Sequence, residues 1–341
     1  MLGIERSQKT SGMRIVLVAV LLIVATCIGG NVSAQDLKSW KDGAVKQSII
    51  DFVAAVTDRD SPSFVPVQDR IAVFDNDGTL WCEQPYYFQL AFAFDRVKAM
   101  ADEHPQWQQD PVMKAALSGD VKTIAEGGEE AVVKVVMESH AGMTTEQFDA
   151  IVSDWIASAK HPVTGRRYQD MVYQPMVELL DYLRKHDFQT WIVSGGGMEF
   201  MRPWATQRYG VPTNQIIGST IELRYQLQDG VPQLLRLPKL AFIDDKEGKP
   251  VAIHRHIGRR PIAAFGNSDG DLQMLQWTAA GSGKRLAVYI HHTDAEREYA
   301  YDRKGHIGRL DKGLDEAAQR DWTVVDMKQD WLTVFPTLQV K

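Results

Sequence analysis

Short, mostly apolar runs recur along this chain of 341 residues, and they restrict its fold more than any other feature of the sequence. A run of this kind is typical of a strand that is buried on both faces of a parallel sheet. Helical patterns lie between several of the runs, as at 176–185 and 272–277. This alternation predicts an α/β fold with a parallel sheet. The predicted strands are residues 71–74, 190–193, 262–265, 286–290 and 322–325.

The segment from residue 86 to residue 170 lacks such runs, and its pattern is helical. We therefore expect a helical subdomain that is inserted into an α/β core made of residues 35–85 and 171–341. Farther along the chain, Asp229-Gly230 separates two stretches with strand-like composition. This dipeptide favours a two-residue turn, so it predicts a β-hairpin.

The N-terminus has the order of a secretory signal peptide. Residues 1–14 include three basic side chains, residues 15–28 form an uncharged and mostly apolar run, and small residues follow up to Ala34. A bilayer span needs about 20 apolar residues, so this run is short for a membrane anchor. We expect cleavage after Ala34, export of the chain, and a periplasmic location. A lipoprotein attached through Cys27 is the alternative, although residues 24–26 match a lipobox poorly.

The charge of the chain excludes one class of partner, and its cysteine content excludes an intramolecular disulfide. The chain has 38 basic and 44 acidic residues, a formal net charge of −6, and no basic run. Clustered Lys and Arg side chains bind nucleic-acid backbones, so we expect no nucleic-acid partner. Cleavage after Ala34 leaves Cys82 as the single cysteine, which excludes an intramolecular disulfide. No second long apolar run follows, so we expect no membrane contact of the mature chain; the sequence leaves its oligomeric state open.

Two carboxylates follow the first predicted strand, in the segment D-N-D-G-T that begins at Asp75. If the chain stays extended, Asp75 and Asp77 point to the same side, and open α/β sheets bind ligands beyond the carboxyl ends of their strands. Such a pair can hold a hard cation such as Mg²⁺, or it can divide the roles of nucleophile and acid–base. An EF-hand turn is the alternative, but a buried strand precedes the segment and its twelfth position is Tyr86.

Polar groups also follow the second and third predicted strands. Ser194, Gly195 and two more glycines precede a helical pattern, so their hydroxyl and backbone N–H groups predict an anion site. A plain glycine-rich turn is the alternative. The segment 266–271, G-N-S-D-G-D, follows the third strand and supplies further oxygen ligands for the same cation.

A lysine near the start of a helix can neutralise an anionic substrate, and the sequence offers two candidates. Lys249 directly precedes Pro250, and proline is favoured at the first position of a helix. We therefore prefer Lys249, with Lys246 as the alternative. The alternative for residues 244–250 as a whole is a solvated, charged turn without a role in binding.

Together these segments resemble the motifs of the haloacid dehalogenase-like (HAD) hydrolase superfamily. Residues 74–80 resemble its first motif, an apolar strand followed by D-x-D-G-T, and Ser194 and a lysine match the second and third motifs. Residues 266–271 are similar to the fourth motif, which is often G-D-x-x-x-D. The phosphoserine-phosphatase-like branch is the most similar one. The resemblance implies a Rossmann-like parallel sheet core with the helical segment 86–170 as a C1-type cap.

The resemblance also implies a Mg²⁺-dependent phosphatase. Asp75 would attack phosphorus and form an aspartyl-phosphate, and Asp77 would protonate the leaving oxygen and then activate water. Ser194, Gly195 and Lys249 would bind the phosphoryl group. Positioning and charge neutralisation are the main needs of phosphoryl transfer, and this set of groups meets them.

The metal ligands implied by the resemblance are Asp75, Asp77, Asn267 and Asp271. Asn267 stands where a metal-binding aspartate is usual. An amide oxygen ligates Mg²⁺ but adds no negative charge. The spacing favours Asn267, and Asp269 is the alternative.

We therefore expect an exported enzyme that hydrolyses a small phosphomonoester. Phosphoryl transfer to an acceptor other than water is the alternative among enzymes, and a secreted, non-catalytic phospholigand-binding protein is the alternative outside them. Asp77 argues against dehalogenation, because relatives that cleave carbon–halogen bonds do not use a second aspartate at this position.

Overall fold

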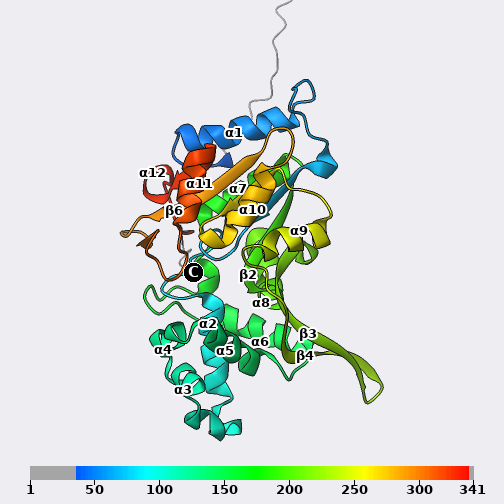
Figure 1. Cartoon of the computed structure of the whole chain (residues 1–341), viewed down its shortest axis with the longest axis vertical. Coiled ribbons are helices and arrows are strands. Elements are labelled where there is room, and N and C mark those ends of the chain that lie inside the picture. Colours follow the sequence, from blue (N-terminus) through cyan, green and yellow to red (C-terminus); the bar gives the residue numbers. More distant parts are fainter. Residues whose placement is uncertain (1–35, 338–341) are drawn as a thin grey trace, which may run out of the picture. The chain divides into compact units, whose positions relative to one another are not determined.

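A sheet of eight strands organises residues 36–337, the part of the chain that the computed structural model describes (Figure 1). The strands are β1 Ile71–Phe74, β2 Gln189–Gly197, β3 Ile216–Gln228, β4 Val231–Phe242, β5 Ala263–Gly266, β6 Leu286–Thr293, β7 Ala300–Tyr301 and β8 Thr323–Asp326. Their order is β4-β3-β2-β1-β5-β6-β7, and β8 pairs with β6. The predicted signal peptide, residues 1–34, lies outside the described residues.

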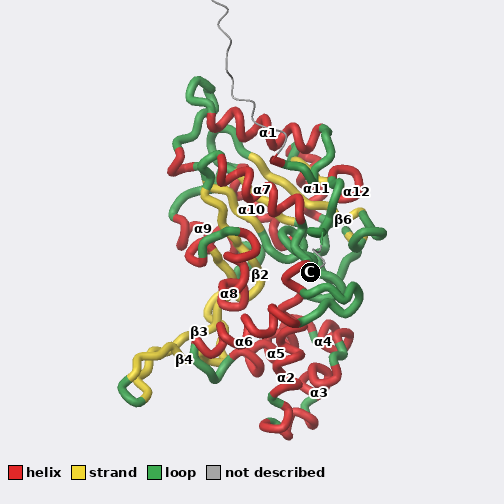
Figure 2. Tube along the Cα trace, turned by 180° about the vertical axis from the view of Figure 1, so that it is seen from behind, coloured by secondary structure: helices red, strands yellow, loops and turns green. Residues whose placement is uncertain are grey.

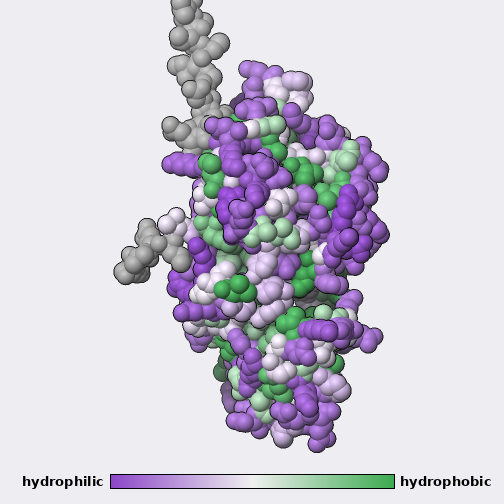
Figure 3. Space-filling model, turned by 90° about the vertical axis from the view of Figure 1, so that its left-hand side faces the viewer, coloured by the Kyte–Doolittle hydropathy of each residue, from purple (hydrophilic) through white to green (hydrophobic). Residues whose placement is uncertain are grey.

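Helices occupy most of the connections between the strands (Figure 2). Between β1 and β2 lie α2 Phe88–Ala99, α3 Pro111–Ser118, α4 Val121–Glu126, α5 Gly128–His140, α6 Thr145–Ser158 and α7 Gln174–Lys185. The others are α1 Ala44–Thr57, α8 Met198–Tyr209, α9 Gly248–Ile257, α10 Leu272–Ala279, α11 Lys312–Arg320 and α12 Met327–Asp330. Within residues 36–337, no helix is both long and apolar enough to cross a membrane. Polar side chains cover most of the face in Figure 3, and apolar ones form small groups.

The central strands run parallel, so the predicted α/β fold with a mostly parallel sheet is confirmed. β1 pairs in parallel with β2 and β5, β5 with β6, and β6 with β8. In the register, Phe74 lies opposite Ile192 on one side and Phe265 on the other. The residues that follow β1, β2 and β5 therefore reach the same edge of the sheet.

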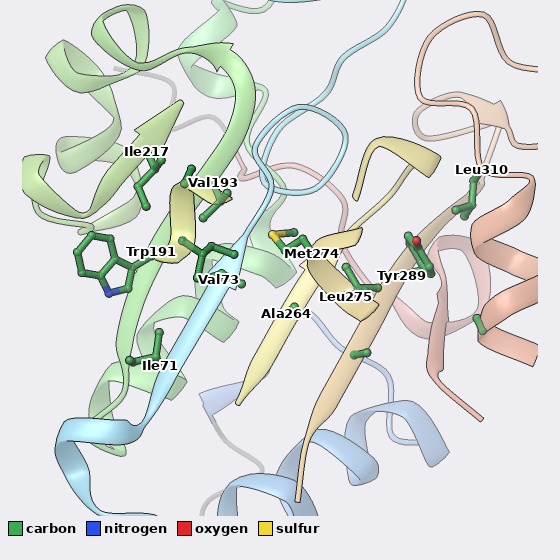
Figure 4. Close-up of a cluster of buried hydrophobic side chains, with 14 residues drawn as sticks. Ile71, Val73, Trp191, Val193, Ile217, Ala264, Met274, Leu275, Tyr289 and Leu310 are labelled. Carbon is green, nitrogen blue, oxygen red and sulfur yellow. The ribbon is translucent and has the colours of Figure 1, made fainter. Parts of the chain in front are cut away.

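Burial on both faces explains why the central strands read as apolar runs. Ile71 and Val73 face a buried cluster that includes side chains of α9, α10 and α11. Alternate residues of a strand point to opposite faces, so Ala72 and Phe74 face the other side. There the ring of Phe74 stacks on that of Phe265, with 4.3 Å between centroids. Figure 4 shows members of the first cluster, among them Ile71, Val73, Trp191, Val193, Ile217, Ala264, Met274, Leu275, Tyr289 and Leu310.

The helices α2 to α5 have an apolar cluster of their own, formed by residues between Leu90 and Val135. Caps fix the ends of neighbouring helices. The Asp110 carboxylate accepts the first free N–H groups of α3, and Thr144 with Gln147 forms a capping box at the start of α6. The division of the chain at 85/86 and at 170/171 stays a prediction.

The predicted hairpin is confirmed. β3 and β4 pair antiparallel around Asp229-Gly230, both of which have positive φ. The middle of β4 contacts the helical segment, since Thr144 pairs with Leu235. Figure 1 shows the hairpin beside α6, and α6 and β4 are in contact.

Candidate active site

Asp75 lies directly after β1, at the edge of the sheet where β2 and β5 also end. Its N–H donates to the carbonyl of Phe265 at 2.9 Å, which continues the β1–β5 pairing for one more residue. Its carboxylate Oδ1 accepts a hydrogen bond from Lys249 Nζ at 2.6 Å. The same Nζ lies 2.7 Å from Oδ1 of Asp271, and all three side chains are buried. Lys249 therefore links the end of β1 to the turn after β5.

The geometry favours Lys249 over Lys246 as the cation of the site. α9 begins at Gly248, two residues before the predicted start, so Lys249 lies in its first turn. The Nζ of Lys249 also donates to the carbonyl of Val193 at 2.8 Å. The side chain of Lys246 is 63% exposed and lies 3.9 Å from the Asp245 carboxylate.

The charges of this cluster are coupled. Desolvation by burial lowers the pKa of Lys249, but Asp271, Asp75 and Asp244 outweigh it and raise that pKa above its ordinary value. Lys249 is therefore an ammonium ion. Burial and the Asp271 carboxylate raise the pKa of Asp75, and Lys249 opposes them. The site thus carries more buried carboxyl groups than ammonium groups.

Asp77 lies beside Ser194, a residue in the C-terminal half of β2. Its Oδ1 accepts a hydrogen bond from the indole N–H of Trp81 at 2.9 Å, and its Oδ2 lies 3.4 Å from the hydroxyl of Ser194. Burial raises the pKa of Asp77, and the hydrogen bond from Trp81 opposes this. A raised pKa favours the protonated form, which a proton donor requires.

The glycines after Ser194 differ from the prediction. They were expected to form a turn with free N–H groups at a helix start, but β2 continues through Gly197. The N–H of Gly196 donates to Ser194 Oγ at 3.0 Å, and that of Gly197 donates to Gln89 Oε1 at 2.7 Å. A bulge shifts the register so that Gly197 pairs with Ser219 of β3. A Cβ on Gly197 would lie 2.7 Å from Gln89 Nε2, so the close approach of Gln89 needs glycine there.

The turn after β5 brings Asn267 and Asp271 to the site and directs Asp269 away from it. The Oδ2 atom of Asp271 accepts the N–H groups of Asn267 and Ser268, at 2.9 and 3.0 Å. Asp269 Oδ1 accepts N–H groups of the segment 311–313, at 3.0 and 2.9 Å. The geometry therefore favours Asn267 over Asp269.

Glu83 is a site residue to which the sequence assigned no role. It is buried, and its Oε1 accepts hydrogen bonds from Asn267 Nδ2 at 2.7 Å and from the Tyr301 hydroxyl at 2.8 Å. The carbonyl oxygen of the Asn267 amide accepts the hydroxyl of Thr79 at 3.1 Å. Burial raises the pKa of Glu83 well above its ordinary value. Glu83 thus fixes the orientation of the Asn267 amide.

The buried side chain of His292 contacts the loop that follows β1. The predicted strand ends at residue 290, but β6 continues to Thr293 because it pairs with β7 and β8 there. His292 is buried, with its Nε2 atom 2.8 Å from the carbonyl of Gly78 and its Nδ1 atom 3.2 Å from Glu298. The thiol of Cys82, a buried free cysteine, lies 3.0 Å from the same carboxylate.

A cation at this site would meet only oxygen donors. Within residues 36–337, no three His, Cys, Asp or Glu side chains are arranged to hold a metal ion by themselves. Mg²⁺ does not require such a cage, because one or two carboxylates, water and substrate phosphate usually complete its shell. The excess of buried carboxyl groups around Asp75, Glu83 and Asp271 is relieved by a cation, so the donor set fits Mg²⁺.

A cavity of about 510 Å³ opens beside these residues. Asp75, Asp77, Gly195 and Lys249 line its floor, and side chains of α5, α8, β3 and β4 are among those that line the remainder. Pockets of this size bind small molecules. The site therefore combines a buried, charged floor with a chamber that the helical segment helps to close.

A sequence profile described as haloacid dehalogenase-like hydrolase matches residues 72–276. The chain belongs to this family of hydrolases. The matched range contains the HAD motifs from Asp75 to Asp271, and thus all the site residues that the sequence predicts. No curated protein shows significant similarity to the chain.

Solved structures resemble this HAD hydrolase at low sequence identity. A conserved protein of unknown function from Anaerococcus prevotii is 16% identical, with a TM-score of 0.55, over 86% of this chain and 94% of that one. A Bordetella pertussis protein of unknown function is 14% identical, with a TM-score of 0.47, over 76% and 98%. A phosphoserine phosphohydrolase-like protein from Francisella tularensis is 14% identical, with a TM-score of 0.37, over 73% and 98%. The Anaerococcus prevotii structure supports the fold alone. The C1 type of the cap stays a prediction.

Proposed function

We propose that this protein is an exported, Mg²⁺-dependent phosphatase that hydrolyses a small phosphomonoester. One observation carries the proposal: in a chain of the HAD hydrolase family, Lys249 lies between the carboxylates of Asp75 and Asp271 at the floor of a small-molecule cavity. Phosphoryl transfer needs a positioned nucleophile and positive charge around the phosphoryl oxygens. Asp75 and Lys249 are suited to these two tasks.

In the proposed first step, a carboxylate oxygen of Asp75 bonds to phosphorus while the ester P–O bond breaks. Asp77 donates its proton to the leaving oxygen, and the alcohol departs. In the second step, Asp77 accepts a proton from water, whose oxygen attacks the phosphorus of the aspartyl-phosphate. Inorganic phosphate leaves and Asp75 is restored. The raised pKa of Asp77 suits the donation that begins this cycle.

The remaining floor residues bind and orient the phosphoryl group. Lys249 balances its charge, and Ser194 and the backbone N–H of Gly195 bind its oxygens. Asp75, Asp77, Asn267 and Asp271 would hold Mg²⁺. When bound, the cation neutralises charge that develops on the phosphoryl oxygens.

Export is proposed on the sequence of residues 1–34, which has the order of a signal peptide. In that case the mature protein begins at Gln35 and works in the periplasm on a small phosphorylated substrate. The acidic net charge of −6 agrees with a partner other than nucleic acid.

The test is phosphate release by the purified protein from a panel of small phosphomonoesters, with Mg²⁺ and with EDTA. We expect release with Mg²⁺ and a loss of about a hundredfold or more in EDTA, because the floor carboxylates then face the phosphate without a cation. Restoring Mg²⁺ should restore the rate. Equal rates in EDTA would contradict the proposed metal dependence. Ligand affinity without phosphate release from any ester would favour a binding protein.

A further inference from the structure

We propose that the cavity selects phosphomonoesters whose leaving alcohol is apolar and carries no second anionic group, such as a medium-length alkyl group. This inference rests on the proposed phosphatase function and adds the substrate class to it. The alcohol would occupy an apolar chamber, defined here by Val133 and Val136 of α5 together with Phe200, Ile221 and Leu240.

One face of α5 turns toward the cavity. Val132, Val133, Val136, Met137 and His140 all line it. Their spacing of three and four residues places them on a single side of the helix. The three valines are only half-buried. A ligand that covers these methyl groups therefore removes apolar surface from water and gains affinity.

Packing of the helical segment does not account for this face. A different side of α5, with Ala131 and Val135, enters the apolar cluster of α2 to α5, and Val132 packs against its border. Val133 and Val136 are members neither of that cluster nor of the cluster that Ile71 and Val73 face. Both are half-buried and line the cavity at the active site, so a ligand can cover them.

Apolar residues of other elements also line the cavity. Phe200 of α8 and Ile221 of β3 are buried, with 2% and 8% exposure, and Leu240 of β4 is half-buried. All three line the same cavity as Val133 and Val136. An alcohol in the chamber would therefore contact hydrocarbon from several elements.

The cations that line the chamber are already engaged or neutral. Arg236 pairs with Glu199, its Nε atom donates to the carbonyl of His140 at 2.7 Å, and its guanidinium lies 3.8 Å from the ring centroid of Phe148. Burial lowers the pKa of His140 well below its ordinary value, so its ring is neutral. A second anionic group on the substrate would find no free partner in the chamber, and burying an unpaired charge is costly.

The two remaining lysines lie at the phosphoryl end of the cavity. The Nζ of Lys249 donates a hydrogen bond to Asp75. The backbone N–H of Lys246 donates to the carbonyl of Gly270 at 3.0 Å, and the Nζ of Lys246 lies 3.9 Å from the Asp245 carboxylate. These charges fit one phosphate group. The geometry thus separates a charged end that takes the phosphate from an apolar end that takes the alcohol.

Esters that differ in charge or in chain length test this assignment. We would measure kcat/KM for hexyl phosphate, 6-phosphonooxyhexanoate and ethyl phosphate. Hexyl phosphate should exceed each of the other two by at least about tenfold, because only its chain both reaches and fits the apolar residues of the chamber. A value for the carboxylate ester or for ethyl phosphate that equals the value for hexyl phosphate would overturn the assignment.

Variants of similar shape test whether the selectivity for the hexyl chain arises in the chamber. Val133→Thr and Val136→Thr add a hydroxyl to the cavity wall with little change in shape, and each should lower kcat/KM for hexyl phosphate about fivefold. The loss with ethyl phosphate should be smaller, because its short chain covers less of these side chains. Val163→Thr is the matched control, because Val163 is 69% exposed and does not line the cavity. Unchanged hexyl selectivity in both cavity variants would overturn the assignment.

Phosphonates separate failure of this inference from failure of the proposed function. Their P–C bond is not hydrolysed, so hexylphosphonate and ethylphosphonate report binding alone. Tighter calorimetric binding of hexylphosphonate without turnover of any ester would sustain the chamber and refute the phosphatase. Turnover without preference for the hexyl chain would support the phosphatase and refute the chamber. Equal or absent binding of the two phosphonates, without turnover, would overturn both.

Discussion

Asn267 and Glu83 form a hydrogen-bonded pair beside the nucleophile candidate, with 2.7 Å between Asn267 Nδ2 and Glu83 Oε1. In the family that the sequence resembles, an aspartate usually stands at the position of Asn267. Here the amide supplies an oxygen, and the adjacent Glu83 is a buried carboxyl group whose pKa burial raises well above its ordinary value. The amide needs this partner, because otherwise its two ends could exchange places. Glu83 is thus a positioning residue for the predicted metal ligand.

We expect Glu83→Gln to weaken Mg²⁺ binding about tenfold, since removal of a partner that orients a ligand typically costs this much. Adding Asn267→Asp should restore binding, because the new carboxylate can accept a hydrogen bond from the new amide. Titration calorimetry with Mg²⁺ measures both without reference to activity. The exposed Glu146→Gln is the control. An unchanged Mg²⁺ affinity in Glu83→Gln, or no recovery in the double variant, would contradict this role.

The sequence predicted part of this site at the residue scale. Asp75, Lys249 and Asp271 follow predicted strands or begin a predicted helix, so parallel topology alone brings them to one edge. Glu83 has no such signal. Its partners Asn267 and Tyr301 lie 184 and 218 residues away along the chain, and only the folded structure brings the three together.

At the scale of elements, the hairpin of β3 and β4 connects the core to the helical segment. Arg236 of β4 exchanges backbone hydrogen bonds with Gly142 and Met143, each at 2.9 Å, and its side chain reaches His140 and Phe148. Because the guanidinium pairs with Glu199 of α8, it is not free for a substrate anion. The same arginine thus joins three elements and leaves the chamber without an unpaired cation.

Strand ends were the least predictable part of the elements. The sequence predicted β2 to end before Ser194 and β6 to end before His291, but these strands reach Gly197 and Thr293. Pairing with Ser219 prolongs β2, and pairing with β7 and β8 prolongs β6. Such partners are distant in sequence, so local periodicity carries no information about them. The apolar centres of the strands were predictable because burial on both faces requires them.

At the scale of the whole molecule, the direction of the central strands could be predicted from the apolar runs in the sequence, but the order of the strands in the sheet could not. Apolar runs that alternate with helices predict parallel strands, whereas the position of β1 between β2 and β5 depends on contacts across the chain. The helical character of residues 86–170 was also visible in the sequence. Export remains a prediction, because residues 1–34 lie outside the described part of the chain.

Stability of the whole fold should depend on pH through Asp244. This side chain is fully buried, and burial raises its pKa from 3.8 to about 7. Between these values the folded chain holds a proton on Asp244 that the unfolded chain has released. The unfolded state therefore binds fewer protons, so this group makes the free energy of unfolding fall as the pH rises from about 4 to about 7.

Asp244→Asn should remove this contribution. Relative to the wild type, we expect the variant to gain on the order of 4 kcal/mol in the free energy of unfolding at pH 8 and little at pH 4. Urea unfolding at both pH values measures the difference. Asp229→Asn, on the exposed hairpin turn, is the control and should show no gain. The same difference at both pH values would show that Asp244 does not titrate in this way.

The claim on which the function depends is that Asp75 carries the phosphoryl group during turnover. The direct measurement is mass spectrometry of enzyme that has been quenched with acid while it turns over hexyl phosphate, with Asp75→Asn in parallel. We predict one added phosphoryl group on the peptide that contains Asp75, and none in the variant, which should fold normally and lose at least about a thousandfold in kcat. A phosphoryl group on another residue, or none at any time during wild-type turnover, would contradict the account.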